Sequence, residues 1–437
     1  MSRSSVVAAF IVVFALIRGI WCLLVIPPWQ GPDEPMHFVL AISSGASVDE
    51  ATRVYMESGV IGSMARYRFW ELTGQVQPDP LPSLIRTSAD IPSPTLYHRV
   101  LGGWLRLTGS PPVDDRWPGA AGIGALLRTG RALSVLMYGG AVVLLYAAAA
   151  LVSRSPALAA LVALLFLGHP QMTFIGACLN SDNLVVLLAS LALYLICHAV
   201  VRQGWTARIA LLAVCLVAPI AKRAGLAITA TVLPVALLPA LRDRRRALLA
   251  ITGAAAVVAV AAGGLWLLGM GRSMVRDVEE VLGIGGWVRE QPPGWWQAFG
   301  THFWETFWGN YGWVQCPIPA WCLRAIGVCV ATALVMVPTG RRRCAGSTGF
   351  GIVLAVCAVQ VVFAVAQVAI AQGMRMELGQ GRHAFVGLPG LCLLVAVGVR
   401  GLVRDSIAPW VLPLIGFGAV LLSEASLWFI AVPCFLR

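Results

Sequence analysis

Fixed charge is scarce in this sequence. Only 12% of the residues are charged and 58% are hydrophobic, whereas soluble domains carry about 25% charged residues. A soluble fold could not hide so much apolar surface, because its own surface must stay largely polar. The scarcity of charge therefore excludes an ordinary soluble protein and indicates that lipid surrounds most of the chain.

Regular alternation of apolar and polar residues is also missing. A membrane-spanning β-barrel would show such alternation, but the apolar runs here are long and unbroken. Because backbone polar groups in lipid must be paired internally, these runs predict helices. We expect an all-α, polytopic membrane protein with about eleven spans, forming one domain over residues 1–437. The predicted spans are 5–26, 129–152, 156–172, 183–201, 207–221, 224–241, 247–269, 320–338, 349–371, 384–400 and 408–431.

Motifs for nucleotides and nucleic acids are absent as well. There is no Walker A loop and no dinucleotide fingerprint. The net charge of +12 comes from arginines in short clusters, such as Arg244–Arg246 and Arg341–Arg343, and not from one basic face. The loops that hold these clusters contain only Asp243 and Asp405 as acids. By the positive-inside rule these loops are cytoplasmic, so we expect a cytoplasmic N-terminus and an external C-terminus.

The eleven cysteines show no zinc or haem spacing, and most lie within apolar runs as small hydrophobic residues. Cys316 and Cys322 differ because both fall in one predicted outer loop. Oxidising conditions outside the cell permit a disulfide there. The sequence leaves two possibilities open, a bridge between these two residues or two free thiols.

Two long segments are predicted to lie outside the membrane. Residues 27–128 form the first extracytoplasmic loop, which contains half of the acidic residues and short amphipathic pieces suited to the membrane surface. Residues 270–320 form an aromatic-rich segment whose spacing suits an interfacial helix. This segment is either an ordinary aromatic belt or a platform for sugar rings and lipid tails. The candidate platform residues are Trp304, Trp308, Tyr311 and Trp313.

Paired carboxylates open the first outer loop, in the segment Gly31–Phe38. Asp33, Glu34 and His37 are costly to desolvate at a membrane surface, which favours a functional site over a solvated turn. The flanking prolines restrict the backbone and so direct the carboxylates. Asp182, flanked by two amides, is a further acidic candidate that suits either helix capping or function. These four residues are the catalytic candidates.

Cationic residues are predicted on the same outer face. Lys222 is the only lysine in the chain, which suggests that a compact ammonium is needed there, and lysine is a point-charge partner for phosphate. Arg382 lies beside glycines that permit close approach of an anion. Snorkelling towards the interface is the alternative for each cation. The candidate phosphate-binding residues are Lys222, Arg223, Arg382, His383, Arg128 and Arg131.

Acids and cations together at a lipid surface suit one chemistry. The cations would hold the phosphate of an amphiphilic lipid donor, and a carboxylate would take a proton from an acceptor hydroxyl. All of the candidates are extracytoplasmic in the predicted topology, where nucleotide sugars are not available. A lipid-linked donor therefore fits better than a nucleotide-linked one.

Four strings carry a resemblance to known proteins: PPWQGPDEPMHF, LNSDNLVVLLASLALYL, TFWGNYGWVQCPIPAW and QGRHAF. In this order, and with an acidic motif after an inside-to-outside first span, the chain resembles the GT-C superfamily of integral membrane glycosyltransferases. More narrowly, it resembles a bacterial branch described as predicted membrane proteins, the domain of unknown function 2142. The resemblance covers almost the whole chain. It departs from the superfamily in lacking a large soluble C-terminal domain, and residues 92–97 match its Pro-Pro-Leu-Tyr string only loosely.

The resemblance implies a GT-C-like fold with extracytoplasmic interfacial helices in the bacterial cytoplasmic membrane. It also implies inverting transfer of a sugar from a polyprenyl-phosphate donor to an extracytoplasmic glycan, lipid or protein. The catalytic base would be Asp33 or Glu34, with Asp182 as a second outer acidic position. Metal use varies in the superfamily, so none is assigned, and a divalent cation would fall to Asp33 and Glu34. The implied partners are the donor, the acceptor and membrane lipids, with no nucleic acid.

Other classes of membrane protein stay in competition. A transporter or flippase of lipid-linked saccharides predicts charges at mid-membrane depth and two related halves. Glu424 is the only clear mid-span acid, and the sequence shows no repeated halves. A polymerase or ligase of lipid-linked glycans would share the donor and the outer loops, and the sequence does not separate it from a glycosyltransferase.

Overall fold

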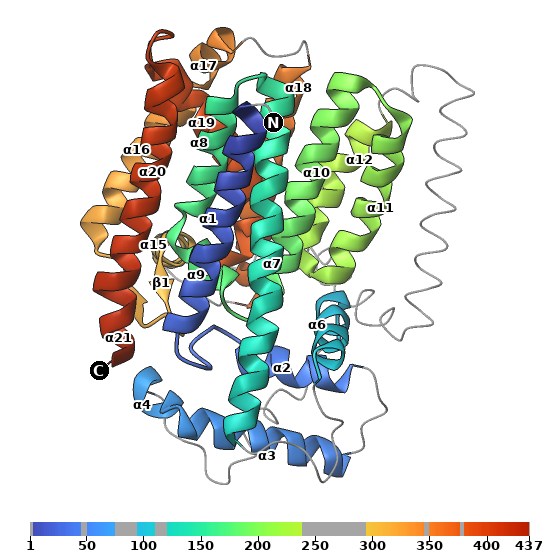
Figure 1. Ribbon diagram of the computed structural model, residues 1–437, viewed down its shortest axis with the longest axis vertical. Helices are drawn as coiled ribbons and strands as arrows, with labels where there is room; N and C mark the ends of the chain where they lie inside the picture. The colour runs from blue at the N-terminus through green and yellow to red at the C-terminus, as the bar shows by residue number, and fades with distance from the viewer. Residues whose placement is uncertain are drawn as a thin grey trace.

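A computed structural model describes residues 3–44, 50–74, 94–109, 120–237, 294–344, 349–375 and 380–436. In these ranges a bundle of long helices stands above a smaller layer of short helices (Figure 1). The bundle helices are α1 (Arg3–Val25), α7 (Ala120–Ser153), α8 (Pro156–Leu167), α9 (Pro170–Gly176), α10 (Asp182–Arg202), α11 (Trp205–Ala221), α12 (Leu226–Leu237), α16 (Ala320–Val335), α17 (Val337–Arg343), α18 (Phe350–Arg375), α19 (Leu388–Leu402), α20 (Ala408–Ser426) and α21 (Val432–Leu436).

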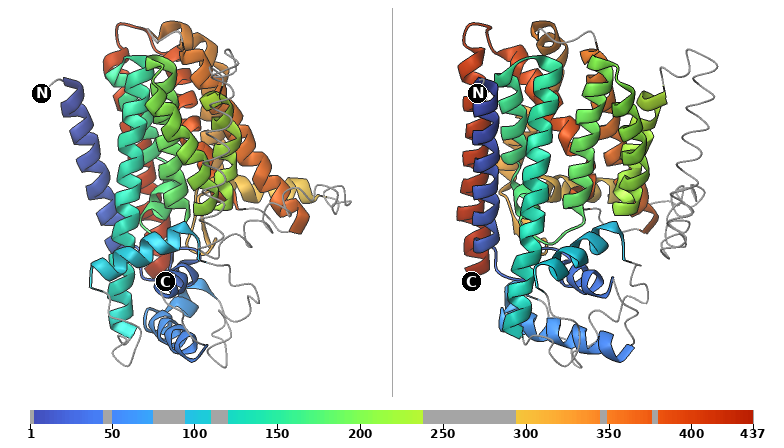
Figure 2. Two further views of the ribbon diagram at one scale, coloured as in Figure 1. Left: turned by 90° about the vertical axis from the view of Figure 1, so that its right-hand side faces the viewer. Right: turned by 45° about the vertical axis from the view of Figure 1, so that its right-hand side comes forward.

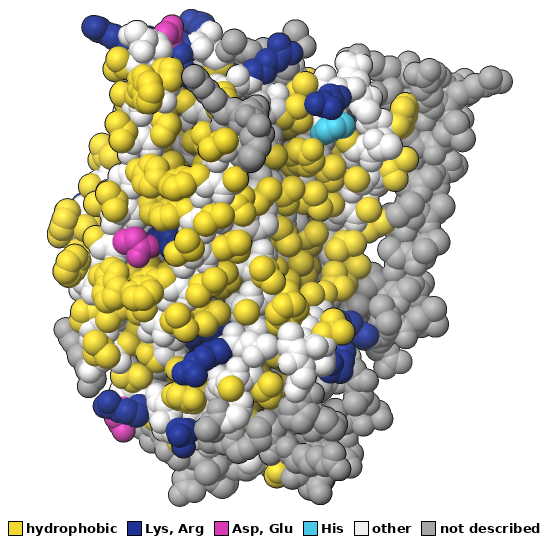
Figure 3. All heavy atoms as spheres, in the orientation of Figure 1, with side chains coloured by type: hydrophobic (Ala, Val, Ile, Leu, Met, Phe, Trp, Pro, Cys, Tyr) yellow, Lys and Arg dark blue, Asp and Glu magenta, His cyan; other side chains and the backbone are white. Residues whose placement is uncertain are grey.

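The all-α, polytopic architecture expected from the sequence is confirmed. Among the described residues, six helices are long and apolar enough to cross a membrane. Two bent helix pairs, α8 with α9 at 72° and α16 with α17 at 54°, raise the number to as many as eight when each pair is counted as one span. An apolar band covers most of the face of the bundle that Figure 3 shows, with cations near both edges of the band.

Within the described ranges, fewer helices qualify as spans than the eleven predicted for the whole chain. The helices over Trp205–Ala221 and Arg223–Leu237 are apolar but shorter than a full span, because the chain breaks between them at Lys222. They pack against each other as a helical hairpin. The predicted span 247–269 lies outside the described residues.

Opposite ends of the bundle differ in charge. One end carries Arg154, Arg202 and Arg341–Arg343, and Asp405 is the only described acid there, paired with Arg400. The N-terminus lies at this end and the C-terminus at the other (Figure 1). Chain ends on opposite sides agree with an odd number of crossings. We refer to these two ends as the arginine-rich end and the outer end.

Short helices form the layer at the outer end. They are α2 (Glu34–Ser43), α3 (Glu50–Arg66), α4 (Phe69–Thr73) and α6 (Leu96–Leu107). Figure 2 shows α3 and α6 lying across the direction of the bundle, as the amphipathic pieces of the first loop predicted. Helix α7 reaches this layer because its 34 residues extend about 50 Å at 1.5 Å per residue, beyond a hydrocarbon core of about 30 Å.

The aromatic segment forms helix α15 (Trp295–Trp308), which also lies across the bundle (Figure 2). It is followed by a short antiparallel hairpin of β1 (Asn310–Tyr311) and β2 (Cys316–Pro317), with Tyr311 opposite Cys316. Residues 270–293 of the predicted segment lie outside the described residues.

Cysteine pairing differs from both possibilities left by the sequence. Cys316 in β2 forms a disulfide with Cys434 in α21, and Cys322 is a free thiol. The prediction considered only cysteines that are close together in the chain. The fold instead brings Cys434, near the C-terminus, next to Cys316 in the hairpin, although the two are 118 positions apart. A disulfide at the outer end agrees with an oxidising exterior on that side.

Candidate functional site

Four separate segments bring charged side chains together at the outer end of the bundle. The loop after α1 and the start of α2 contribute Asp33 and His37, and the start of α10 contributes Asp182. Lys222 comes from the break after α11. The last members, Arg382 and His383, lie in the 3₁₀ helix η4 (Gly381–Gly387). We call these six residues the polar cluster.

Asp33 and Arg382 form the first ion pair of the polar cluster. Arg382 Nη2 donates to Asp33 Oδ2 at 2.6 Å, and Arg382 Nε donates to Gln380 Oε1 at 2.6 Å. The Asp33 side chain is 37% exposed, whereas that of Arg382 is 5% exposed. The third nitrogen, Arg382 Nη1, is buried without a hydrogen-bond partner in the described residues. One donor is therefore left for a ligand.

Asp182 and Lys222 form the second ion pair. Lys222 Nζ donates to Asp182 Oδ1 at 2.6 Å and lies 3.4 Å from His383 Nδ1. The backbone N–H of Asp182 donates to Asn180 Oδ1 at 2.9 Å, which orients the start of α10. Asp182 Oδ2 is buried and has no partner among the described groups. Since buried polar atoms are normally hydrogen-bonded, this oxygen is available to accept from a ligand.

The position of Lys222 follows from the local sequence. Pro219 lies in the last turn of α11, and the chain becomes extended at Lys222 before the 3₁₀ turn η1 (Arg223–Gly225). Gly225 makes this tight return possible, because a Cβ there would lie 2.1 Å from the carbonyl oxygen of Ala218. The break leaves Lys222 at the outer end of the bundle, with its side chain 20% exposed.

Helix α15 supports η4, which carries Arg382. The N–H of Gly381 donates to Thr306 Oγ1 at 2.7 Å, and the rings of Phe307 and Phe385 pack at a centroid distance of 5.6 Å. A Cβ on Gly381 would lie 2.2 Å from the carbonyl oxygen of Phe303. A glycine is therefore required where η4 meets α15.

His37 is linked to a second histidine that the sequence did not single out. Its Nδ1 lies 2.9 Å from His98 Nε2, and the backbone N–H of Thr95 donates to His98 Nδ1 at 3.0 Å. When both rings are neutral, these contacts place the His98 proton on Nε2, where it is donated to His37 Nδ1. The His37 proton then resides on Nε2.

Charges around the first pair shift two pKa values outside the spans. Burial raises the pKa of Asp33, but Arg382 and His37 outweigh it, so that this pKa lies below its ordinary value. Burial lowers the pKa of His37 to about 4, against the opposing effect of Asp33. At neutral pH the carboxylate is therefore ionised and the imidazole is neutral.

Glu34 and Arg131 lie apart from the polar cluster as a fully buried pair. Arg131 donates through Nε to Glu34 Oε1 at 2.8 Å and through Nη2 to Glu34 Oε2 at 2.7 Å. Glu34 also accepts from the N–H groups of Leu179 at 2.9 Å and Gly31 at 3.0 Å. All of these contacts are internal, so the pair ties the first outer loop to α7 and to the segment that joins α9 to α10. This buried placement sets Glu34 and Arg131 apart from the polar cluster, and their catalytic and phosphate-binding roles stay predictions.

The two other predicted cations lie in α7 and η1. Arg128 is exposed on α7, one turn before the buried Arg131. Arg223 is half-buried in η1, next to Lys222 in the chain.

Of the four candidate platform residues, Tyr311 is buried and the three tryptophans are half-buried against the core. Tyr311 is fully buried, with its hydroxyl bonded to Ser426, and Trp308 stacks on His169 at 4.7 Å. The indole N–H groups of Trp304 and Trp313 donate to backbone oxygens at 3.2 Å and 3.0 Å. Tyr311 therefore has no free ring face, and the helix that bears Trp304 and Trp308 serves to support η4.

Metal-binding geometry is not found in the described part of the chain. No group of three or more His, Cys, Asp or Glu side chains there is arranged to hold a metal ion. Asp33 and Glu34, the pair considered for a divalent cation, have arginine partners instead.

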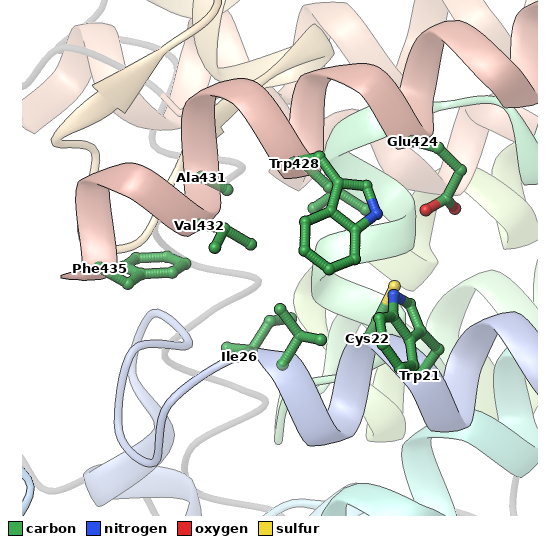
Figure 4. Close-up of a pocket in the computed structure, with 10 residues that line it drawn as sticks. Trp21, Cys22, Ile26, Glu424, Trp428, Ala431, Val432 and Phe435 are labelled. Carbon is green, nitrogen blue, oxygen red and sulfur yellow. The ribbon is translucent and has the colours of Figure 1, made fainter.

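A second polar feature lies on the apolar side of the bundle. Glu424 in α20 pairs with Arg18 in α1, and Arg18 also donates to Ser423 Oγ at 2.7 Å and to Thr173 Oγ1 at 2.9 Å. Figure 4 shows Glu424 at the margin of a pocket whose other labelled residues are mostly apolar. They come from the end of α1 and from residues 428–435, which follow α20. Arg18, an arginine inside the first apolar run, is the sequence signal for this pair, and the expectations above did not include it.

Sequence reasoning missed further residues of the site. Gln380 and His98 position Arg382 and His37 through side-chain contacts. Gln380 is two positions before Arg382 in the chain, and this proximity is only a weak indication that it belongs to the site. Nothing in the spacing of residues 37 and 98 indicates that these two histidines meet, because the contact joins residues 61 positions apart.

These features define an integral membrane protein with a charge-balanced polar centre at one end of a helical bundle. The family model described as Predicted membrane protein (DUF2142) matches residues 120–391, and the chain belongs to this family. No curated protein and no solved structure matches the chain.

Proposed function

We propose that this protein is a glycosyltransferase of the GT-C type, acting at the outer face of the bacterial cytoplasmic membrane. Its donor is a sugar linked to a polyprenyl phosphate, and its acceptor is a hydroxyl group of a glycan, lipid or protein outside the cytoplasm. One observation carries the proposal. Two carboxylate–cation pairs meet at the outer end of the bundle with a buried donor, Arg382 Nη1, and a buried acceptor, Asp182 Oδ2, both unpartnered among the described residues.

Arg382 and Lys222 are the groups suited to the phosphate. A guanidinium binds phosphate through directed N–H donors, and an ammonium adds a compact charge. Both lie at the end of apolar helices, where a prenyl chain would remain in lipid while its phosphate reaches the polar cluster. A charged head joined to an apolar tail matches this arrangement.

Asp33 is the group suited to act as general base. The acceptor oxygen forms a new bond to the anomeric carbon as its proton passes to the carboxylate. The bond between that carbon and the phosphate oxygen breaks, and the phosphate leaves with the electron pair. Asp33 is the more exposed carboxylate of the polar cluster, at 37% against 1% for Asp182, so an acceptor from water reaches it more readily.

A polymerase or ligase of lipid-linked glycans would use the same donor chemistry and remains the second candidate. Transport is less well supported, because the described mid-bundle charges of Arg18 and Glu424 neutralise each other in one pair. A transport pathway needs groups that exchange partners with a substrate, whereas the donors of Arg18 are engaged within the protein.

The test is sugar transfer by the full-length protein in liposomes that contain polyprenyl-phosphate sugars and candidate acceptors. Asp33→Asn keeps the shape of the side chain and removes its basicity, so transfer should fall by about 10²–10⁴-fold. Asp405→Asn is the matched control, because Asp405 pairs with Arg400 at the arginine-rich end. Full transfer by Asp33→Asn, or equal loss in Asp405→Asn, would contradict the assignment.

A further inference from the structure

The ion pair between Asp33 and Arg382 engages one donor, Nη2, of the cation that the phosphate needs, and leaves only Nη1 without a partner among the described residues. Arg382 donates to Asp33 at 2.6 Å, and Lys222 donates to Asp182 at the same distance. With the histidines neutral, two carboxylates and two cations leave the polar cluster without net charge. An incoming phosphate therefore meets cations that are already engaged by anions of the protein.

Asp33 is the more accessible of the two internal anions. Its side chain is 37% exposed, whereas the guanidinium behind it belongs to a side chain that is 5% exposed. An anion that approaches from the open side reaches the Asp33 carboxylate before it reaches Arg382. Asp182 differs because it is 1% exposed and sits behind the more exposed Lys222.

The Asp33 carboxylate has an alternative position at the N-terminus of α2. Asp33 is the N-cap residue of α2, where aspartate side chains commonly accept from the helix, yet its side chain makes no capping hydrogen bond. A carboxylate displaced from Arg382 would remain at the positive end of the helix dipole. Release from Arg382 therefore does not leave the charge without electrostatic stabilisation.

We propose that Asp33 is an internal competitor for the phosphate site, held on Arg382 until a phosphate displaces it. The proposal rests on the proposed function and adds regulation to it. With Arg382 engaged by Asp33, the carboxylate is a weak base. Phosphate binding moves Arg382 to the ligand and frees Asp33 for the acceptor hydroxyl, so that the base becomes active only when the donor is in place.

Affinity for a phosphate lipid tests this mechanism without any transfer step. Decaprenyl phosphate is titrated into the full-length protein in nanodiscs, and inorganic phosphate is titrated in a parallel series. Asp33→Asn should bind decaprenyl phosphate about tenfold more tightly than the wild type, a gain of about 1.4 kcal/mol. A parallel gain for inorganic phosphate would show that the phosphate group itself is recognised, and a gain for the lipid alone would identify the lipid as the ligand.

A double-mutant cycle separates competition at Arg382 from general electrostatics. In an Arg382→Gln background, the Asp33→Asn gain should vanish, because the contested cation is gone. An equal gain in both backgrounds would overturn the proposal, since it would reflect only the loss of a negative charge. Asp405→Asn should leave affinity unchanged.

The substitution Asp33→Asn introduces no backbone strain that would alter the binding measurement. Asp33 has φ 62°, in the left-handed region, which asparagine tolerates well. Asp33→Gly also suits this conformation and replaces Asp33→Asn if that variant fails to fold. If a folded Asp33 variant binds decaprenyl phosphate no more tightly than the wild type, while the wild type transfers sugar normally, the competition between Asp33 and phosphate is refuted and the proposed function is not. Absence of both phosphate-lipid binding and transfer in the wild type would refute the proposed function as well.

Discussion

Asp33 and Glu34 are neighbours in the chain, yet their carboxylates have different environments. Asp33 has a left-handed backbone conformation just before α2, and Glu34 begins that helix. The change of conformation sends one side chain to the partly exposed Arg382 pair and the other into a buried pair with Arg131. At the scale of single residues, burial separates a group suited to chemistry from one suited to holding the loop in place.

Removing one member of the buried pair should destabilise the protein. Glu34→Gln leaves the Arg131 charge buried without its counterion, and such changes cost about 3–5 kcal/mol. Thermal unfolding in detergent measures the effect. The double variant with Arg131→Gln should lose less than the sum of the two single variants. Wild-type stability combined with lost transfer in Glu34→Gln would instead move the catalytic role to Glu34.

Helix ends and short connections, more than helix interiors, build the site. The break at Lys222, the 3₁₀ helix η4 and the start of α10 each place one charged group at the outer end of the bundle. Gly225 and Gly381 make two of these connections possible, because a Cβ at either position would collide with a backbone oxygen. At the scale of elements, interruptions of apolar helices position the polar groups.

The hairpin of β1 and β2 is joined to α21 by the Cys316–Cys434 disulfide. Cys316→Ser and Cys434→Ser should each lower stability, typically by about 2–4 kcal/mol, and the double variant should lose no more than either one. Cys322→Ser is the control, since Cys322 is a free thiol. Thermal unfolding and peptide mapping under non-reducing conditions give the readout. A mapped bridge between Cys316 and Cys322 would contradict this pairing.

The two ends of the helical bundle differ in their charged residues and in the elements that they carry. The arginine-rich end carries a single described acid, Asp405, whereas the polar cluster, the layer of short helices and the disulfide lie at the outer end. The charge asymmetry supports a cytoplasmic arginine-rich end, and the disulfide supports an oxidising outer end. The proposed reaction would then take place where lipid-linked donors are presented outside the cytoplasm.

Reporter fusions test this orientation. A reporter enzyme that is active only outside the cytoplasm should be inactive when fused at Arg342 and active when fused at Gly294. Arg342 lies in α17 at the arginine-rich end, and Gly294 precedes α15 at the outer end. A fusion at Gly109, beyond α6, should also be active. External activity at Arg342 would reverse the orientation and remove the site from the outer face.

The sequence by itself determined the class of protein and the position of most helices. Long apolar runs leave the backbone no alternative to helices in lipid, and each described run predicted as a span contains helix. Residue type also identified Asp33, Asp182, Lys222 and Arg382 as candidates. Desolvating an ionisable group beside an apolar run costs free energy, so such a group indicates a functional site. These inferences depend on composition and neighbours in the chain.

Only the tertiary structure decided which of these groups meet. Asp33 pairs with Arg382 across 349 positions, Asp182 with Lys222 across 40, and Cys316 with Cys434 across 118. The sequence could not separate Asp33 from Glu34, because the distinction depends on Arg131, which is 97 positions away in a helix that continues into the outer layer. The physical reason is that ion pairing and burial depend on distance in space, which follows from how helices pack and where they break.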